Sequence, residues 1–296
     1  MPKIKVTNLP SPKRLDVYLT QELPQNRSYF AMLNAQGKIL VNNQPVKNGY
    51  ILKEGDEIDI DYITTLKLEP MKMDLDIVYE DPYLIVVNKP KGLVVHPAGS
   101  YREATLVHGI LSKLEARDDN DLRPGIVHRI DKDTSGLVVV AKNKNILEQL
   151  STSLKDHKFD RIYYALVRGT VKEDHQTIST FIKRDPHNRL RFCITSSANN
   201  AKWAVTHFQV IQRWDNFTLL EVKLETGRTH QIRVHLSSMG YVIYGDSLYG
   251  DKHNSEGQYL HAKSLGFTHP VTKEYLFFNS ELPTYFSDFL DKLDHQ

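Results

Sequence analysis

The stretch that most constrains the fold of this chain is residues 125–142, which read GIVHRIDKDTSGLVVVAK. The second half, Leu137–Ala141, is a Val-rich apolar run after Gly136, a pattern typical of a buried strand. The first half carries charged and hydroxyl side chains almost without interruption. Polar groups beside a buried strand are costly unless they are paired, so this stretch predicts a functional site rather than a structural turn.

Two familiar kinds of site share part of this pattern but fail on the rest. Residues 131–136 imitate the start of a calcium-binding EF-hand loop, which needs a bidentate Glu at its twelfth position and a helix after it. The twelfth residue here is Lys142, and β-branched residues follow the glycine. Ser135 lacks the GxSxG context of a serine hydrolase. The remaining candidate is a carboxylate, Asp131, close to the cation Arg129.

The distribution of charge divides the chain into modules, although the net charge of the whole is only +2. Residues 1–53 carry eight Lys or Arg against two acidic residues, whereas residues 54–82 carry ten acidic residues against two Lys. A change of sign this sharp marks a boundary, and a basic first module suits a polyanion, with a solvated basic face as the alternative. We expect a small domain over residues 1–62, a linker over 63–74 and a large domain over 75–296.

Local patterns in the first module predict two short helices and small strands. Apolar periodicity favours helices over residues 14–23 and between Ser28 and Gly37. A strand over residues 38–41 leads into Asn42-Asn43, a pair that tolerates the left-handed conformation of a hairpin turn.

The second module contains many short strands and few helices, which predicts an α+β domain around a mixed, mainly antiparallel sheet. The expected strands cover residues 77–79, 84–87, 93–95, 137–141, 162–167, 204–212 and 217–224. The expected helices cover residues 104–115, 145–154 and 231–239.

A second polar motif, LETGRTHQIRVHL over residues 224–236, leads into the last of these helices. Gly227 permits a tight turn and Thr229 can cap the helix, while Arg228 and Arg233 lie at and just inside its start. A cation is unfavourable at that end of a helix unless an anion lies beside it. The motif therefore predicts an anion near Arg233.

The sequence offers little for a metal centre or for export. His128, His230, His235 and His261 suggest no zinc site, because His230 and His235 diverge on a helix and no HExxH motif occurs. Cys193 is the single cysteine, which excludes an intramolecular disulfide and a cysteine-based zinc cluster. The first residues lack the apolar core of a signal peptide, and no run is long enough to span a membrane. We expect a cytoplasmic monomer without a metal or a membrane partner.

The first module looks like an S4 RNA-binding domain. In that family RLD…L, SRx…GxVxVNG and LxxGD recur; here Arg27-Ser28 inverts one pair and Asn43 replaces a glycine. A basic domain of this kind suits RNA, and the residues expected to bind it are Lys13, Arg14, Arg27 and Lys38.

The second module resembles the RluA-type pseudouridine synthases. HRIDKDTSGL at residues 128–137 matches their HRLDxxTSGL signature, with Ile130 in place of Leu. Further motifs follow the same order: YED…VVNKPKGLVVHP at 79–97, RIYYALVRG at 161–169 and GRTHQIRVHL at 227–236. The resemblance implies conversion of uridine to pseudouridine in RNA, an isomerisation that requires no cofactor.

The resemblance also implies roles for individual residues. Asp131 is expected to be the catalytic carboxylate and Arg233 its ion-pair partner, because a guanidinium can hold an enclosed carboxylate charged and oriented. Tyr163 is expected to stack on the base and to relay a proton, although a tyrosine in a strand is usually a core residue. Arg129 is expected to fill the gap left when the target base leaves its stack.

Other activities stay open on the sequence alone. The chain could bind RNA without activity, against which stand the intact Asp131, Tyr163 and Arg233. It could also be an N-glycoside hydrolase with the same Asp, which would release free uracil. The order of an S4 domain before this catalytic domain favours large-subunit ribosomal RNA over tRNA as the substrate.

Overall fold

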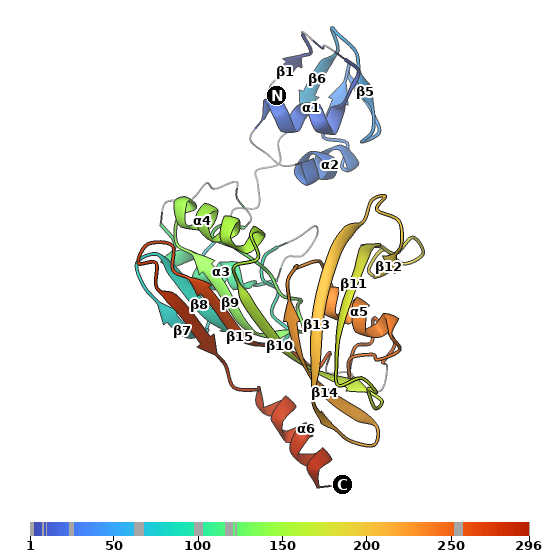
Figure 1. Ribbon diagram of the computed structural model, residues 1–296. Helices are drawn as coiled ribbons and strands as arrows, with labels where there is room; N and C mark the ends of the chain where they lie inside the picture. Colours follow the sequence, from blue (N-terminus) through green and yellow to red (C-terminus); the bar gives the residue numbers. More distant parts are fainter. Residues whose placement is uncertain are drawn as a thin grey trace. The chain divides into compact units, whose positions relative to one another are not determined.

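The computed structural model describes residues 3–7, 9, 11–23, 27–61, 68–97, 103–115, 121, 123–251 and 257–295. The chain forms two compact units (Figure 1). The smaller unit contains most of residues 1–69 and the larger unit most of the remainder. Within the described residues, no helix is both long and apolar enough to cross a membrane.

The smaller unit combines short helices with short strands, as the sequence predicts. Its elements are β1 (Lys3–Lys5), β2 (Lys13–Arg14), α1 (Leu15–Glu22), α2 (Arg27–Ala35), β3 (Ile39–Val41), β4 (Gln44–Pro45), β5 (Ile51–Leu52) and β6 (Glu57–Ile60). The strands form a sheet in the order β1-β6-β3-β4, and β2 pairs separately with β5. Asn42 and Asn43 turn between β3 and β4 with φ of 53° and 62°. Leu19, Leu33 and Ile58 form part of a fully buried core.

The larger unit is organised around one long sheet. Its elements are β7 (Asp76–Glu80), β8 (Leu84–Lys89), α3 (Leu106–Ile110), β9 (Ser135–Ala141), α4 (Lys144–Lys155), β10 (Asp160–Arg168), β11 (His175–Arg184), β12 (Phe192–Thr195), β13 (Lys202–Arg213), β14 (Phe217–Leu224), α5 (Gln231–Ser238), β15 (Leu260–Thr268), β16 (Tyr275–Asn279) and α6 (Thr284–Asp294). The strand order is β12-β11-β13-β14-β10-β15-β9-β8-β7, with β16 beside β15. Neighbouring strands are antiparallel except β15 and β9, so the predicted α+β class with a mainly antiparallel sheet is confirmed.

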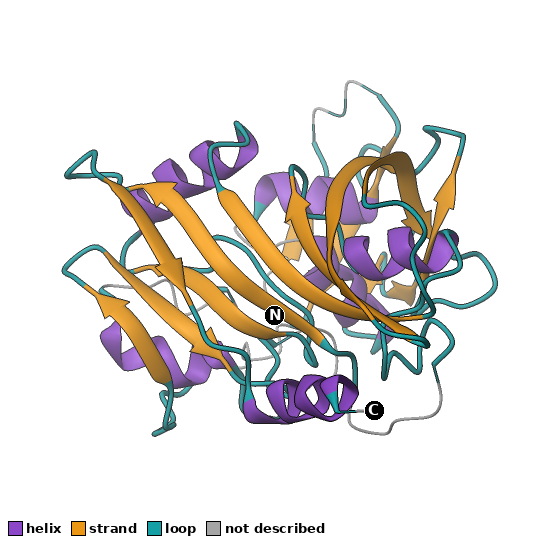
Figure 2. Cartoon of the chain, turned by 60° about the horizontal axis from the view of Figure 1, so that its bottom comes forward, coloured by secondary structure: helices purple, strands orange, loops and turns teal. Residues whose placement is uncertain are grey.

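Both faces of the sheet are apolar around β9, which explains why this strand is buried along its whole length. Figure 2 shows the sheet with the helices packed around it. On β9, Val138 and Val140 point into the main core cluster, to which α3 and α5 contribute. Leu137 and Val139 point to the opposite face, where α4 packs. The C-terminal helix α6 inserts the fully buried Phe286 against β10 and β14.

One expectation for the region before β9 is wrong, and another holds only over a shorter range. Residues 93–95 form no strand and contribute only an isolated bridge between Val94 and Thr105. The helix expected over residues 104–115 is limited to α3 and a single 3-10 turn after it. A Cβ atom on Gly109 would lie 2.7 Å from the Leu75 side chain, so α3 approaches the start of the domain closely. That tertiary contact is not visible in a periodic pattern.

Part of the expected linker is attached to the larger unit. Residues 62–67 lie outside the described residues. After them, the Met71 N–H donates a hydrogen bond to the His108 carbonyl (3.0 Å), and Met73 lies against Gly109. The boundaries proposed from the sequence stay a prediction.

The middle of the large sheet is a narrow join. Strand β15 lies between β10 and β9, and its parallel pairing with β9 involves only His261 with Ser135 and Ala262 with Gly136. Gly136 has φ of 110°, and a Cβ atom there would lie 2.3 Å from the Ala262 carbonyl oxygen. Only glycine fits this close approach without strain. The join holds the loop before β9 over the centre of the sheet.

Candidate active site

The carboxylate of Asp131 and the guanidinium of Arg233 meet at this join. Asp131 lies in the loop before β9, and Arg233 lies in the first turn of α5. Arg233 Nη1 donates a hydrogen bond of 2.8 Å to Asp131 Oδ2. Among the described residues, Asp131 Oδ1 has no hydrogen-bond partner, and the side chain is 18% exposed. One oxygen is therefore fixed by Arg233, and the side chain lines a cavity.

Arg233 has a second acidic partner that the sequence reasoning missed. Its Nε and Nη2 donate to the two carboxylate oxygens of Asp246 at 2.7 and 2.9 Å, and the Asp246 side chain is only 1% exposed. Burial opposes the charge on Arg233, but Asp246 and Asp131 together raise its pKa above the ordinary value. The paired hydrogen bonds to Asp246 thus fix the plane of the Arg233 guanidinium, and Nη1 is left to bind Asp131. The sequence signal that could have pointed to Asp246 is its place in the glycine-bounded motif GDSLYG at residues 245–250.

The start of α5 differs from the prediction in its cap. Thr229 does not cap the helix; the N-cap residue is His230, with φ of 57°. The Arg228 N–H donates instead to the Gln231 side chain (3.0 Å). The left-handed His230 places its Nε2 3.9 Å from Asp131 Oδ2, and burial lowers its pKa, which favours the neutral imidazole. Its proximity to Asp131 was not foreseen.

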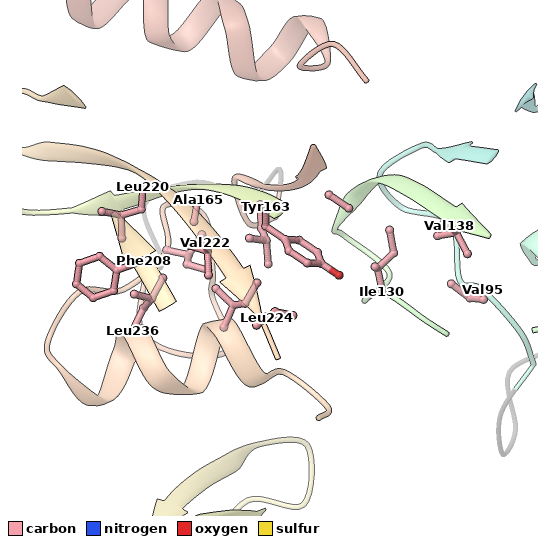
Figure 3. Close-up of a cluster of buried hydrophobic side chains, with 14 of the residues drawn as sticks. Val95, Ile130, Val138, Tyr163, Ala165, Phe208, Leu220, Val222, Leu224 and Leu236 are labelled. Carbon is pink, nitrogen blue, oxygen red and sulfur yellow. The ribbon is translucent and has the colours of Figure 1, made fainter. Parts of the chain in front are cut away.

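The cavity beside Asp131 collects most of the expected site residues. It is lined by Asp131, Tyr163, Arg233, Arg129, Arg161 and His230, among others. Tyr163 is 6% exposed and belongs to the main core cluster, with its hydroxyl directed to the side where Ile130 lies (Figure 3). Burial raises the pKa of Tyr163, opposed by the charge of Arg161. The phenol is therefore protonated at neutral pH.

Arg129 and Arg161 bring two further cations to the cavity. Arg129 is exposed at the surface, and its Nη1 lies 3.3 Å from His96 Nε2. Arg161, in contrast, is only 6% exposed and donates to the carbonyl oxygens of Glu225 (3.1 Å) and Leu224 (3.5 Å). Sequence reasoning did not assign Arg161 a role.

The four basic residues proposed for RNA binding lie in the smaller unit. Arg14 and Arg27 both donate to the buried carboxylate of Asp16, at distances from 2.6 to 3.1 Å, yet their side chains are 46% and 55% exposed. Lys13 donates to Gln21, and Lys38 pairs with Asp61. Asp16 thus holds two guanidinium groups side by side at the surface. Their contact with RNA stays a prediction.

Two of the histidines considered for a metal site, His128 and His261, bond to the protein framework. The His128 ring accepts a hydrogen bond from the Val139 N–H, and burial lowers its pKa to about 3. His261 lies between the hydroxyl groups of Ser135 and Ser280, with its pKa lowered to about 4 by burial. In the described part of the chain, no group of three or more His, Cys, Asp or Glu residues could hold a metal ion.

Residues 83–238 match the RNA pseudouridylate synthase family, and residues 13–58 match the S4 domain. The chain belongs to the RNA pseudouridylate synthase family, with an S4 domain before the synthase domain.

Individual relatives agree with this assignment over nearly the whole chain. An uncharacterised RNA pseudouridine synthase of Bacillus subtilis is 41% identical over 288 residues, which are 95% of this chain and 94% of the relative. The ribosomal large subunit pseudouridine synthase D of Neisseria meningitidis serogroup A is 39% identical over 91% of this chain and 76% of the relative. The solved structure of human RNA pseudouridylate synthase domain containing 1 superimposes with a TM-score of 0.58 at 26% identity, covering 77% of this chain and 98% of the human chain.

Proposed function

We propose that this RNA pseudouridine synthase modifies uridine in large-subunit ribosomal RNA and that Asp131 is its catalytic carboxylate. The names of the relatives from Neisseria and from Zymomonas mobilis support the ribosomal substrate. The observation that carries the catalytic assignment is the geometry of Asp131, which lines the cavity while one of its oxygens is held by Arg233. A monomeric state and a cytoplasmic location stay predictions.

The reaction breaks the N1–C1′ bond of uridine and joins C5 of the uracil to C1′. A carboxylate can assist by attacking C1′ or by removing a ribose proton, and both routes need Asp131 in the same place. Arg233 holds it there and is itself oriented by Asp246, and both of these side chains are largely buried. A preorganised carboxylate of this kind needs little rearrangement during the reaction.

Mapping pseudouridine in total RNA from cells with and without the protein tests the substrate. We expect the missing modification in large-subunit ribosomal RNA. Loss of a site in tRNA alone would overturn the ribosomal assignment. Release of free uracil by the purified protein, without pseudouridine, would instead identify an N-glycoside hydrolase.

Tyr163 supplies a ring for stacking and a hydroxyl that can relay the C5 proton. We expect Tyr163→Phe to lower the single-turnover rate by about 10²–10⁴, the usual contribution of a positioned acid or base. RNA affinity should stay within a few-fold, because the ring is kept. Tyr163→Ala should weaken binding as well. A Phe variant that reacts like wild type would limit Tyr163 to stacking.

The S4 domain should raise the local concentration of RNA without taking part in the chemistry. A variant beginning at Pro70, the first residue of the larger unit, keeps the Met71–His108 hydrogen bond and should fold. We expect weaker RNA binding and a salt dependence of log affinity that is shallower by about 0.7–0.9 per lost phosphate contact. The saturated single-turnover rate should be unchanged.

Rate-versus-concentration series at two salt concentrations measure both effects. An unchanged affinity and salt slope would remove the RNA-binding role from the S4 domain. A large fall in the saturated rate would show instead that this domain positions the substrate.

A further inference from the structure

Arg161 is a buried cation that lacks an acidic partner among the described residues. Its hydrogen bonds go to the carbonyl oxygens of Leu224 and Glu225, and its Nε has no partner although it is shielded from solvent. Burial lowers its pKa, and the nearby charge of Arg228 acts in the same direction. A buried guanidinium without a carboxylate is costly, and the cavity that it lines can hold a ligand that compensates it.

The position of Arg161 relates it to the reacting base. Arg161 and Tyr163 are two residues apart on β10, where burial alternates over residues 160–165, so both side chains lie on the same face of the sheet. Both line the cavity that contains Asp131. A uracil stacked on the Tyr163 ring therefore has the Arg161 guanidinium at its periphery.

Gly227 leaves the space that the guanidinium occupies. A Cβ atom at this glycine would lie 2.7 Å from Arg161 Nη1, so any side chain there must displace the guanidinium. The backbone at Gly227 does not have a positive φ, so backbone conformation does not explain why a glycine stands here. The guanidinium of Arg161 can thus occupy its position because residue 227 has no side chain.

We propose that Arg161 is a further catalytic residue that stabilises the uracil anion after its bond to the ribose breaks. When N1–C1′ breaks, the bonding pair leaves with the uracil, and the negative charge spreads over N1 and the two carbonyl oxygens. C5 then bonds to C1′, the C5 proton is lost and N1 takes up a proton, which balances the isomerisation. This inference rests on the proposed reaction at Asp131.

The structure favours the uracil over a backbone phosphate as the partner of Arg161. A second cavity adjoins the first. Arg161 lines both cavities, and the wall of the second also includes Arg129, Lys155 and Arg228. These side chains are more exposed than Arg161, so they suit a phosphate that stays partly hydrated. Arg161 lies deeper and shares its strand face with Tyr163, where a base fits.

The first experiment compares wild type with Arg161→Gln on three RNA substrates that carry uridine, 5-fluorouridine or 5-deuterouridine at the target. We expect a loss of about 10²–10³ in the single-turnover rate on uridine, the usual effect of removing one donor to a developing anion. The loss should be much smaller with 5-fluorouridine, whose uracil is more acidic and needs less stabilisation. Because fluorine replaces the C5 proton, the reaction of this substrate is followed as breakage of the N1–C1′ bond and not as pseudouridine formation. The single-turnover rate of Arg161→Gln should be the same on 5-deuterouridine as on uridine.

Other outcomes overturn the proposal. Equal losses on uridine and 5-fluorouridine would show that Arg161 does not act on the leaving uracil. A new isotope effect from C5 deuterium would place its action on the proton transfer at Tyr163. Weaker RNA affinity with an unchanged saturated rate would make it a phosphate anchor.

Gly227→Ala tests the same idea without removing a charge. The added methyl group should displace the guanidinium and reproduce the substrate dependence of Arg161→Gln, and Arg161→Lys should retain part of the rate. Thermal melting of each variant reports folding separately. A wild-type protein that forms no pseudouridine would refute the proposed function itself, whereas active Arg161 variants beside an inactive Asp131→Asn would refute only this inference.

Discussion

Asp131→Asn should abolish pseudouridine formation and leave RNA affinity within a few-fold of wild type. The substitution keeps the size of the side chain and a hydrogen-bonding group for Arg233, but it removes the negative charge and the nucleophilic carboxylate from the cavity wall. Both routes considered for Asp131, attack at C1′ and removal of a ribose proton, depend on that carboxylate. The measurement is single-turnover conversion of a ribosomal RNA fragment at saturating protein.

Asp133→Asn is a matched control, because Asp133 lies in the same loop and does not contact Arg233 among the described residues. This variant should keep most of the activity. If Asp131→Asn retains more than about a tenth of the wild-type rate, the assignment of Asp131 as the reacting carboxylate is wrong, because a lost catalytic base or nucleophile lowers rates by far more.

Arg233→Ala should remove activity and also destabilise the protein. The substitution leaves the buried Asp246 without its partner, and breaking a buried ion pair in this way costs about 3–5 kcal/mol of the free energy of unfolding. Asp131 loses its orientation at the same time. Thermal or denaturant unfolding measures the first effect, and single-turnover kinetics measure the second.

The two acidic partners allow the two effects to be separated. Asp246→Asn should reduce stability and disturb the orientation of Arg233, whereas Asp131→Asn should change stability little because Asp131 is more exposed. A double variant, Arg233→Met with Asp246→Leu, removes both buried charges and should regain stability without regaining activity. An Arg233→Ala protein that melts like wild type and turns over normally would show that the ion pairs do not matter for either property.

The pairing of Asp131 with Arg233 could be predicted because both residues stand in long local motifs. The helix-dipole argument added a physical reason, since a cation at the start of α5 requires an anion nearby. The second anion, Asp246, could not be placed from the sequence, because nothing in its local pattern indicates which guanidinium it contacts. Arg161 was missed for a similar reason. Its significance depends on the finding that no carboxylate of the described residues pairs with it, and a local pattern does not contain that information.

Elements were predictable where their periodicity was strong, as in β9, β14 and α4. The prediction failed at residues 93–95, where an apolar run packs without joining the sheet ladder. The position of β15 in the centre of the sheet was also out of reach. Strand order depends on contacts between distant segments, and a local pattern does not contain them.

The central position of β15 in the sheet has a consequence for folding during synthesis. Strand β15 is among the last strands in the chain, yet it joins β10 to β9, so the two parts of the sheet stay separate while the growing polypeptide leaves the ribosome. Asp131 and Arg233, 102 residues apart, can meet firmly only after Thr268 has emerged. Contacts of such long range form slowly. An unfinished chain therefore has no assembled catalytic cleft, and activity begins only when synthesis is nearly complete.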